Sequence, residues 1–247
     1  MKRFTIIALL ALVAAGAAFA QDVNKILKDL DELGDFDNQD FSAVYTIVSQ
    51  KPGEKDSVSS VQLFRRDKKK QFTMIVLLPE VNKGQGYLRE ADNVWFYDPT
   101  SRKFSFSSIK ENIQDSEARN SDLTLRGFAV DYESSGVREG TIGSIPVWII
   151  DLKAKTNDVS YERLVLHVAK RQTMLLKEEA YSVSGRLMRT TVYGKPVKLG
   201  DKQLPSQIII MDELNPGERS QLTMTQQSLS AIPDRVFTKA YLEQVSK

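Results

Sequence analysis

Apolar residues change their spacing along this chain from a helical period to a strand period near residue 41. Between residues 22 and 33 they recur three and four positions apart and stop at Gly34, which predicts one amphipathic helix. From Phe41 onward, apolar and polar residues alternate in segments separated by turn residues, which predicts strands. The short links between these segments indicate antiparallel neighbours.

An irregular stretch at 108–127, with helix-compatible segments, divides the predicted strands, and a last helix is expected to end at about Val245. A sheet of this size must bury one face, and curling around a few helices achieves this. The sequence therefore predicts a mainly β (α+β) fold: an incomplete antiparallel β-barrel of about 11–12 strands, with helices covering its mouth. The strand-like segments are 41–50, 57–67, 71–78, 84–90, 93–97, 102–107, 130–139, 145–154, 161–168, 173–182, 186–193, 205–213 and 218–228.

The segment 83–107 has an aromatic residue at many alternate positions around an Asp98-Pro99 turn, which predicts a β-hairpin. A loop over 98–101 would place Trp95 opposite Phe104. The aromatic face is then either ordinary core or the lining of a pocket for an apolar ligand. It carries Trp95, Tyr97, Phe104 and Phe106, while Val94, Phe96, Lys103 and Ser105 lie on the other face.

Residues 1–20 have the pattern of a secretory signal: Lys2-Arg3, an apolar run and a small-residue site, with cleavage expected before Gln21. Residues 21–247 are then predicted to form a single exported domain. No cysteine is present, so neither a disulfide nor a thiol-linked lipid anchor is expected.

The charge balance argues against nucleic acid as a partner. The chain has 34 basic and 32 acidic residues, and Lys2 and Arg3 belong to the signal, so the remainder is formally neutral. Binding to nucleic acid needs a sustained basic surface. The basic run at 65–70 lies between two predicted strands and is interpreted as a solvated hairpin tip.

Catalytic chemistry is sparse. His167 is the only histidine and there is no cysteine, so no usual zinc site can form. Ser107 and Lys110 match an S-x-x-K pattern without its usual partner motifs. We predict no catalytic residue, no metal and no cofactor, and hence not an enzyme. An esterase using Ser107 or His167 is kept as a third hypothesis.

Two predicted strands are apolar on both faces. In one, Phe72, Met74 and Val76 alternate with Thr73 and Ile75. The other spans 147–152 and includes Trp148. Such strands occur where a sheet is covered on both sides or where one face lines a cavity.

Three segments resemble the LolA-like family of periplasmic outer-membrane lipoprotein-sorting proteins: GYLREADNVWFYDPTSRKFSF (86–106), YSVSGRLMRTTVY (181–193) and IPDRVFTKAYLE (232–243). A W-F-Y-[ND]-P hairpin also occurs in LolA-type carriers. The resemblance, which covers nearly the whole chain after the signal, implies a LolA/LolB-like unclosed barrel with a helical lid over a hydrophobic cavity for acyl chains.

The resemblance also implies site residues. Arg66 matches the arginine that latches the lid in LolA-type carriers, with Arg65 as the alternative, although Asp67 stands where those carriers commonly have proline. We expect Trp95 and Phe104, rather than Phe96, to face inward. The residues expected to line the lipid site are Phe64, Phe72, Met74, Val76, Trp95, Phe104, Phe106 and Trp148.

The implied function is a monomeric periplasmic carrier that binds lipoprotein acyl chains, or another lipid, and delivers them toward the outer membrane. Each buried methylene is worth about 0.8 kcal/mol, so acyl chains cannot cross an aqueous compartment uncovered. An inner-membrane transporter would be the donor and an outer-membrane protein the acceptor. The alternative is a periplasmic interaction module, or an accessory of an envelope lipid transporter, in which the sheet is simply filled.

Overall fold

The computed structural model describes residues 23–36, 38–90, 93–156 and 159–246. The predicted signal at 1–20 and its cleavage point before Gln21 lie outside these residues. The described residues form two compact units: those within Met1–Glu32 and Gly127–Arg186 (unit 1), and those within Leu33–Arg126 and Leu187–Lys247 (unit 2). The single domain over 21–247 stays a prediction.

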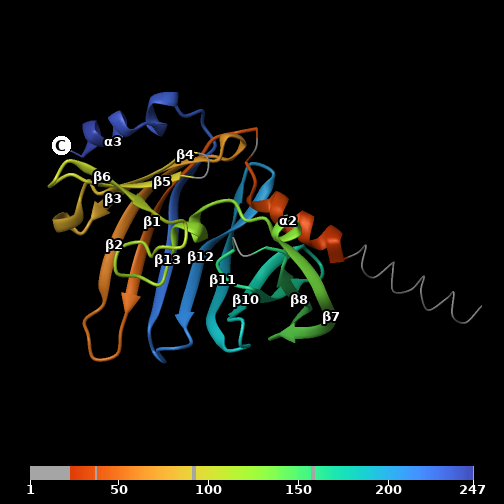
Figure 1. The fold of residues 1–247 in the computed structure, drawn as a ribbon. Helices are drawn as coiled ribbons and strands as arrows, with labels where there is room; N and C mark the ends of the chain where they lie inside the picture. Colours follow the sequence, from red (N-terminus) through yellow and green to blue (C-terminus); the bar gives the residue numbers. More distant parts are fainter. Residues whose placement is uncertain (1–22, 37, 91–92, 157–158, 247) are drawn as a thin grey trace, which may run out of the picture. The chain divides into compact units, whose positions relative to one another are not determined.

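Unit 2 contains nine of the described strands, and their order in the sheet is β6-β5-β4-β3-β2-β1-β13-β12-β11. Every neighbouring pair is antiparallel, as the short links between strand segments predict. The strands are β1 (Phe41–Gln50), β2 (Ser57–Arg66), β3 (Gln71–Leu78), β4 (Gly86–Glu90), β5 (Asn93–Asp98), β6 (Lys103–Ser107), β11 (Leu187–Leu199), β12 (Lys202–Asp212) and β13 (Arg219–Ser228) (Figure 1).

Unit 2 also contains four short 3-10 helices and the C-terminal helix α3 (Lys239–Val245). The Thr238 side chain accepts a hydrogen bond from the Tyr241 amide and so caps α3. In Figure 1, α3 lies along the sheet beside β3 to β6. The 3-10 helices are η1 (Asp67–Lys69), η2 (Glu80–Asn82), η3 (Asn120–Leu123) and η4 (Asp234–Phe237).

Unit 1 contains the antiparallel strands β7 (Tyr132–Ile142), β8 (Ile145–Ala154), β9 (Arg163–Ala169) and β10 (Met174–Tyr181). A helix at 23–34 begins in this unit, and the short helix α2 (Phe128–Asp131) precedes β7. The Asp31 carboxylate accepts hydrogen bonds from the Phe128 and Ala129 amides at 2.7 and 2.9 Å. This carboxylate therefore satisfies the first amides of α2, which have no backbone acceptor within the helix.

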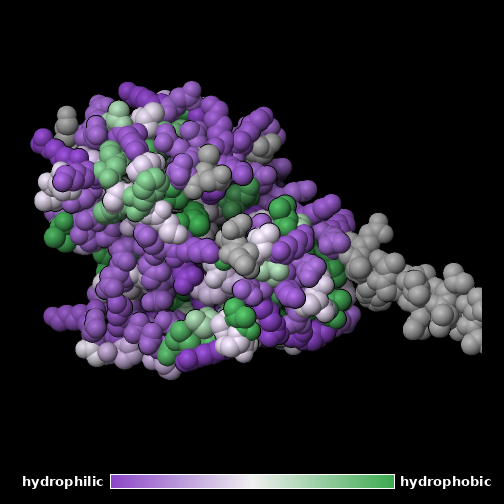
Figure 2. All heavy atoms as spheres, in the orientation of Figure 1, coloured by the Kyte–Doolittle hydropathy of each residue, from purple (hydrophilic) through white to green (hydrophobic). Residues whose placement is uncertain are grey.

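The predicted class, mainly antiparallel β with few helices, is confirmed, and the described strands number thirteen. None of the helices among the described residues is long and apolar enough to cross a membrane. Figure 2 shows apolar patches scattered over a largely polar face of the molecule.

Candidate functional site

Each strand of unit 2 has two faces, which we name after neighbouring residues of β3, the Met74 face and the Ile75 face. Both residues are buried, Met74 at 0% and Ile75 at 8% exposure, so the strand is covered on both sides. On the Met74 face the strands bury one continuous apolar cluster, because every second residue of β1, β2 and β3 points into it. Its strand members include Phe41, Tyr45, Ile47, Leu63, Phe72, Met74, Val76, Tyr87, Val94, Ile210, Leu222 and Met224.

A stretch without strand periodicity, residues 108–126, packs against the Met74 face, and we call it the cover segment. Ile113, Ala118 and Leu123 from this segment are buried in the cluster of that face. The segment is braced internally: the Ile113 amide donates to the Ala118 carbonyl at 2.6 Å, and the buried Asn120 side chain donates to the Ser108 carbonyl at 3.0 Å. Hydrogen bonds within the segment thus fix its conformation. Its three buried apolar side chains help to hold it on the sheet.

Polar contacts also attach the cover segment to the strands. The Asp122 carboxylate accepts from the buried Arg189 guanidinium on β11 at 2.7 Å. The Glu117 amide donates to the buried Ser220 hydroxyl on β13 at 2.9 Å. These contacts were not anticipated from the sequence, because the cover segment has no period that would reveal its buried side.

Arg65 lies at the end of β2 on the Met74 face and is 8% exposed. Its guanidinium donates to the Leu123 carbonyl of the cover segment at 3.4 Å and to the Gly34 carbonyl. It forms an ion pair with Asp67 at 2.7 Å and lies over the Phe41 ring. A single buried cation therefore joins β2, the cover segment and the last residue of the N-terminal helix.

Arg66, the predicted latch, points to the opposite face. It pairs with Asp40 at 2.8 Å and with Asp234, and it donates to the Ile232 carbonyl at 2.5 Å. The Arg66 guanidinium lowers the pKa of the Asp40 carboxyl and is itself held more firmly protonated. Arg66 thus connects β2 to the start of the C-terminal segment.

Helix α3 covers the Ile75 face. Leu242 is fully buried and packs with Ile75, Leu88 and Tyr97. Above the hairpin, the Lys239 ammonium lies 3.3 Å from the centroid of the Trp95 ring. A cleft of about 820 Å³ lies between the helix and the hairpin turn, lined by Tyr97, Pro99, Arg102, Ala240, Glu243, Gln244 and Ser246.

The expected pairing of Trp95 with Phe104 is wrong. Trp95 lies opposite Phe106, and Tyr97 lies opposite Phe104, because the turn spans 99–102 and Asp98 still pairs with Lys103. The four aromatic residues nevertheless share one face as predicted. Both pairs lie on the Ile75 face with their rings tilted, and the ring centroids are 4.1 and 4.7 Å apart.

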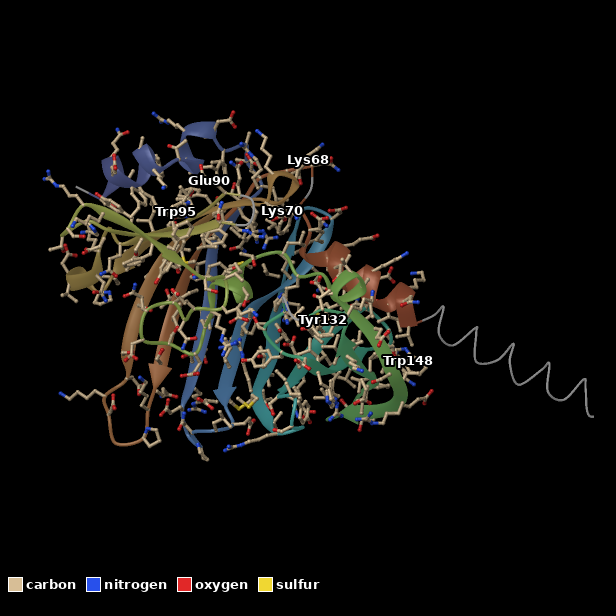
Figure 3. The ribbon with its side chains drawn as sticks, viewed as in Figure 1. Lys68, Lys70, Glu90, Trp95, Tyr132 and Trp148 are labelled. Atoms are coloured by element: carbon tan, nitrogen blue, oxygen red, sulfur yellow. The ribbon has the colours of Figure 1, made fainter. Side chains whose placement is uncertain are left out.

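The predicted lipid-binding residues therefore do not form one site: they lie on both faces of unit 2 and, for Trp148, in unit 1. Phe96, not Trp95, shares the Met74 face, and its ring centroid lies 5.1 Å from that of Tyr87. Trp148 lies on β8 in unit 1 (Figure 3). The Lys170 ammonium is 3.9 Å from the centroid of its ring. Phe72, Met74 and Val76 lie on the Met74 face, and Phe64, Trp95, Phe104 and Phe106 on the Ile75 face.

The candidate esterase residues have unremarkable surroundings. The Ser107 hydroxyl donates to Glu111 at 2.6 Å rather than to Lys110. His167 has a lowered pKa, chiefly because of burial, with Glu179 3.8 Å away. Neither residue is therefore arranged as an activated nucleophile with its base among the described residues.

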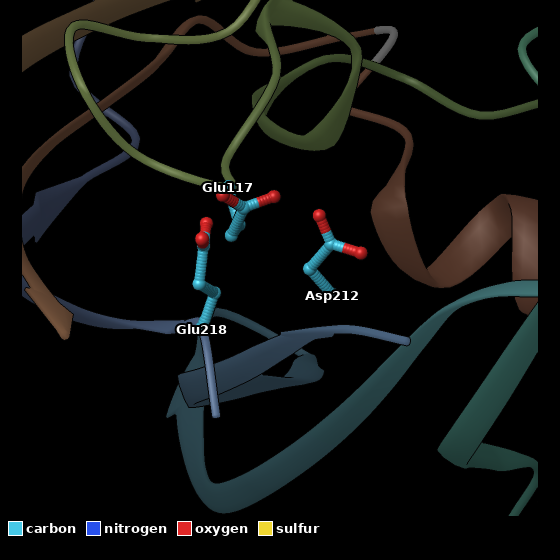
Figure 4. A group of neighbouring side chains, drawn as sticks. All are labelled: Glu117, Asp212 and Glu218. Atoms are coloured by element: carbon cyan, nitrogen blue, oxygen red, sulfur yellow. The ribbon is translucent and has the colours of Figure 1, made fainter. Parts of the chain in front are cut away.

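Three carboxylates converge in unit 2: Glu117 from the cover segment, Asp212 from β12 and Glu218 before β13 (Figure 4). Their ligand atoms lie within 4.8 Å of one another. Burial and the two neighbouring carboxylates raise the pKa of Glu117. Repulsion among these carboxylates destabilises the fold at neutral pH, at the place where the cover segment meets the sheet.

A family model described as "Uncharacterized protein" matches residues 68–244, more than two thirds of the chain. The chain belongs to this family. No curated protein matches the sequence.

Three solved structures share the fold of this chain. A LolA superfamily protein from Nitrosomonas europaea is 25% identical, with a TM-score of 0.77 over 90% of this chain and 98% of that one. A protein domain from Vibrio parahaemolyticus, described as outer membrane lipoprotein-sorting, is 17% identical, with a TM-score of 0.78 over 89% and 97%. A DUF1329 family protein from Desulfovibrio piger is 17% identical, with a TM-score of 0.80 over 90% and 98%. The predicted fold class, the incomplete antiparallel barrel of LolA-like proteins, is thereby confirmed.

Proposed function

We propose that this LolA-like protein is a periplasmic carrier that binds acyl chains of a lipoprotein, or of another lipid, against the Met74 face. The observation that carries this proposal is the way unit 2 closes that face, with an irregular segment attached by several polar contacts. The names of the similar structures, LolA superfamily and lipoprotein sorting, support the same role.

Exchange of the cover segment for acyl chains is energetically plausible. Displacing Ile113 and Leu123 removes apolar side chains from the cluster of the Met74 face. An acyl chain that takes their place restores burial at about 0.8 kcal/mol per methylene. The net cost of opening is then set mainly by the polar attachments, and these can re-form with water or with a partner protein.

Among those attachments, Arg65 is the better candidate for the latch than Arg66, because Arg65 bonds the cover segment directly. Removing a buried cation's partner is costly, so opening must expose Arg65 and Asp67 to water together. A donor protein in the inner membrane would drive this opening, and an outer-membrane acceptor would take the released chains.

A pair of neighbouring variants tests which face binds the lipid. Met74→Gln and Ile75→Gln each place one amide in a buried position of β3, on opposite faces. The proposal expects that Met74→Gln abolishes binding of a fluorescent palmitoyl probe while Ile75→Gln retains it, both being checked for folding by circular dichroism. Equal binding by wild type and Met74→Gln would refute it.

The latch assignment is tested separately by Arg65→Met and Arg66→Met. We expect Arg65→Met to bind the probe but to transfer lipoprotein to acceptor-containing membranes abnormally, and Arg66→Met to transfer it normally. The reverse pattern would return the role to Arg66. If no acyl ligand binds and native mass spectrometry finds none in gently purified protein, the filled interaction module is the better description.

A further inference from the structure

Strand β6 ends the strand order of unit 2, and β5 is its partner among the described strands. Its outer edge therefore presents backbone N–H and C=O groups that a further strand could pair with. Phe106 on this strand is 71% exposed, although its ring contacts that of Trp95 with the centroids 4.1 Å apart. An exposed edge that carries a large aromatic side chain is a typical site of strand pairing.

The sequence of β6, Lys-Phe-Ser-Phe-Ser, is complementary to itself in the antiparallel direction. We propose that β6 pairs with β6 of a second copy of this chain about a two-fold axis at Ser105. Residues that face each other across antiparallel strands lie on the same face of the sheet, so only every second register is allowed. Of these, the register centred on Ser105 alone places all five residues opposite one another.

This register pairs aromatic residues on the Ile75 face and brings a lysine near a glutamate on the Met74 face. On the Ile75 face, Phe104 lies opposite the second copy's Phe106, extending the pairs Trp95–Phe106 and Tyr97–Phe104 into two four-membered aromatic rows. Cross-strand aromatic pairs stabilise antiparallel sheets.

On the Met74 face, Lys103 lies opposite the second copy's Ser107, whose hydroxyl is bonded to Glu111 at 2.6 Å. Lys103 is exposed and has no carboxylate within ion-pair distance among the described residues. The dimer brings each Lys103 close to one Glu111, and this charge complementarity favours a second copy over an acidic peptide or an anionic membrane. The proposal replaces the expectation of a monomer.

A five-residue strand pair is smaller than a standard interface of about 1,600 Å², so we expect a dimer that dissociates on dilution. Because the chain contains no cysteine, a single engineered thiol can report its geometry. Ser105→Cys places two thiols on the two-fold axis, where facing Cα atoms lie about 4.5–5.5 Å apart, within disulfide range. Ser101 is also exposed but would lie far from its symmetry mate, so Ser101→Cys serves as the control.

The proposal predicts that Ser105→Cys forms a disulfide dimer on mild oxidation and that Ser101→Cys does not. In sedimentation equilibrium, Phe106→Ser should weaken the wild-type dimer roughly tenfold, since each dimer loses two aromatic pairs. Lys103→Glu and Glu111→Lys should each weaken it, and the double variant should restore it. Equal cross-linking at both positions, or a wild-type chain that stays monomeric at its highest soluble concentration, would overturn the proposal.

Discussion

The contact between Leu242 and Gly86 fixes α3 on the Ile75 face, and it predicts an energetic coupling between these positions. Leu242 is fully buried. A Cβ on Gly86 would lie 2.6 Å from Leu242 Cδ2 and 3.0 Å from the Met74 carbonyl oxygen. Carbon atoms prefer a separation of about 3.5–4.0 Å, so Gly86→Ala forces the leucine, and with it α3, away from the sheet.

The expected magnitudes follow from these contacts. Leu242→Ala should destabilise unit 2 by about 2–5 kcal/mol, because it empties a fully buried site. Gly86→Ala should cost about 1–3 kcal/mol for the overlap, less about 0.5–1 kcal/mol gained by replacing glycine within a strand. In the double variant the new methyl occupies the space that the leucine has left. We therefore expect the double variant to be more stable than the sum of the single variants by about 1–3 kcal/mol.

Urea unfolding followed by tryptophan fluorescence measures these values. Trp95 reports on unit 2 once Trp148 is replaced by phenylalanine in every variant. Gly194→Ala on β11 is the matched control, because a Cβ there meets nothing within 4 Å and should be neutral or stabilising. Free energies for Gly86→Ala and Leu242→Ala that simply add within about 0.5 kcal/mol would refute the docking of α3 on Gly86.

Further predictions concern pH and one hydrogen bond. Because the folded-state pKa of Glu117 is raised above its usual 4.5, wild type should lose stability as pH rises through that region, and Glu117→Gln should remove this loss in pH-dependent unfolding. The pKa of His167 is lowered from 6.5, so the neutral side chain contributes to folding stability fully above pH 6.5, and this contribution is lost as the pH falls. The stability of His167→Gln should therefore fall less on acidification than that of wild type. Thr73→Val removes the 2.7 Å hydrogen bond from the Thr73 hydroxyl to the Val236 carbonyl. It should lower the free energy of unfolding by about 1–2 kcal/mol and with it the melting temperature, so an unchanged melting temperature would contradict that bond.

Much of the fold could be predicted because strand alternation survives in nearly every segment. The hairpin shows the limit of that signal. Asp98 remains in β5, with its carboxylate accepting from the Thr100 amide at 3.0 Å, and Arg102 adopts a left-handed conformation with φ of 54°. This shifts the turn by one residue and the pairing by two, so the predicted faces are as expected while the opposite partners are wrong.

The candidate site was less predictable, for two physical reasons. Whether residues of different strands share a face depends on register, which alternation within one strand does not give. The burial of Ile113 and Leu123 in the cover segment comes from tertiary contacts that leave no periodic pattern in the sequence. Asp122 and its partner Arg189 are 67 residues apart, so nothing local identifies them as a pair.

The position of the lipid and the identity of the latch are one question, because Arg65 and Arg66 point to opposite faces of β2. Arg65 bonds the cover segment, which closes the Met74 face, whereas Arg66 bonds the segment that leads into α3, which closes the Ile75 face. A latch can control access only to the face that its partner covers. Loss of probe binding in Met74→Gln must therefore accompany altered transfer in Arg65→Met, and loss in Ile75→Gln must accompany altered transfer in Arg66→Met. A mixed result, with the lipid on one face and the latch on the other, would rule out a lid mechanism in unit 2.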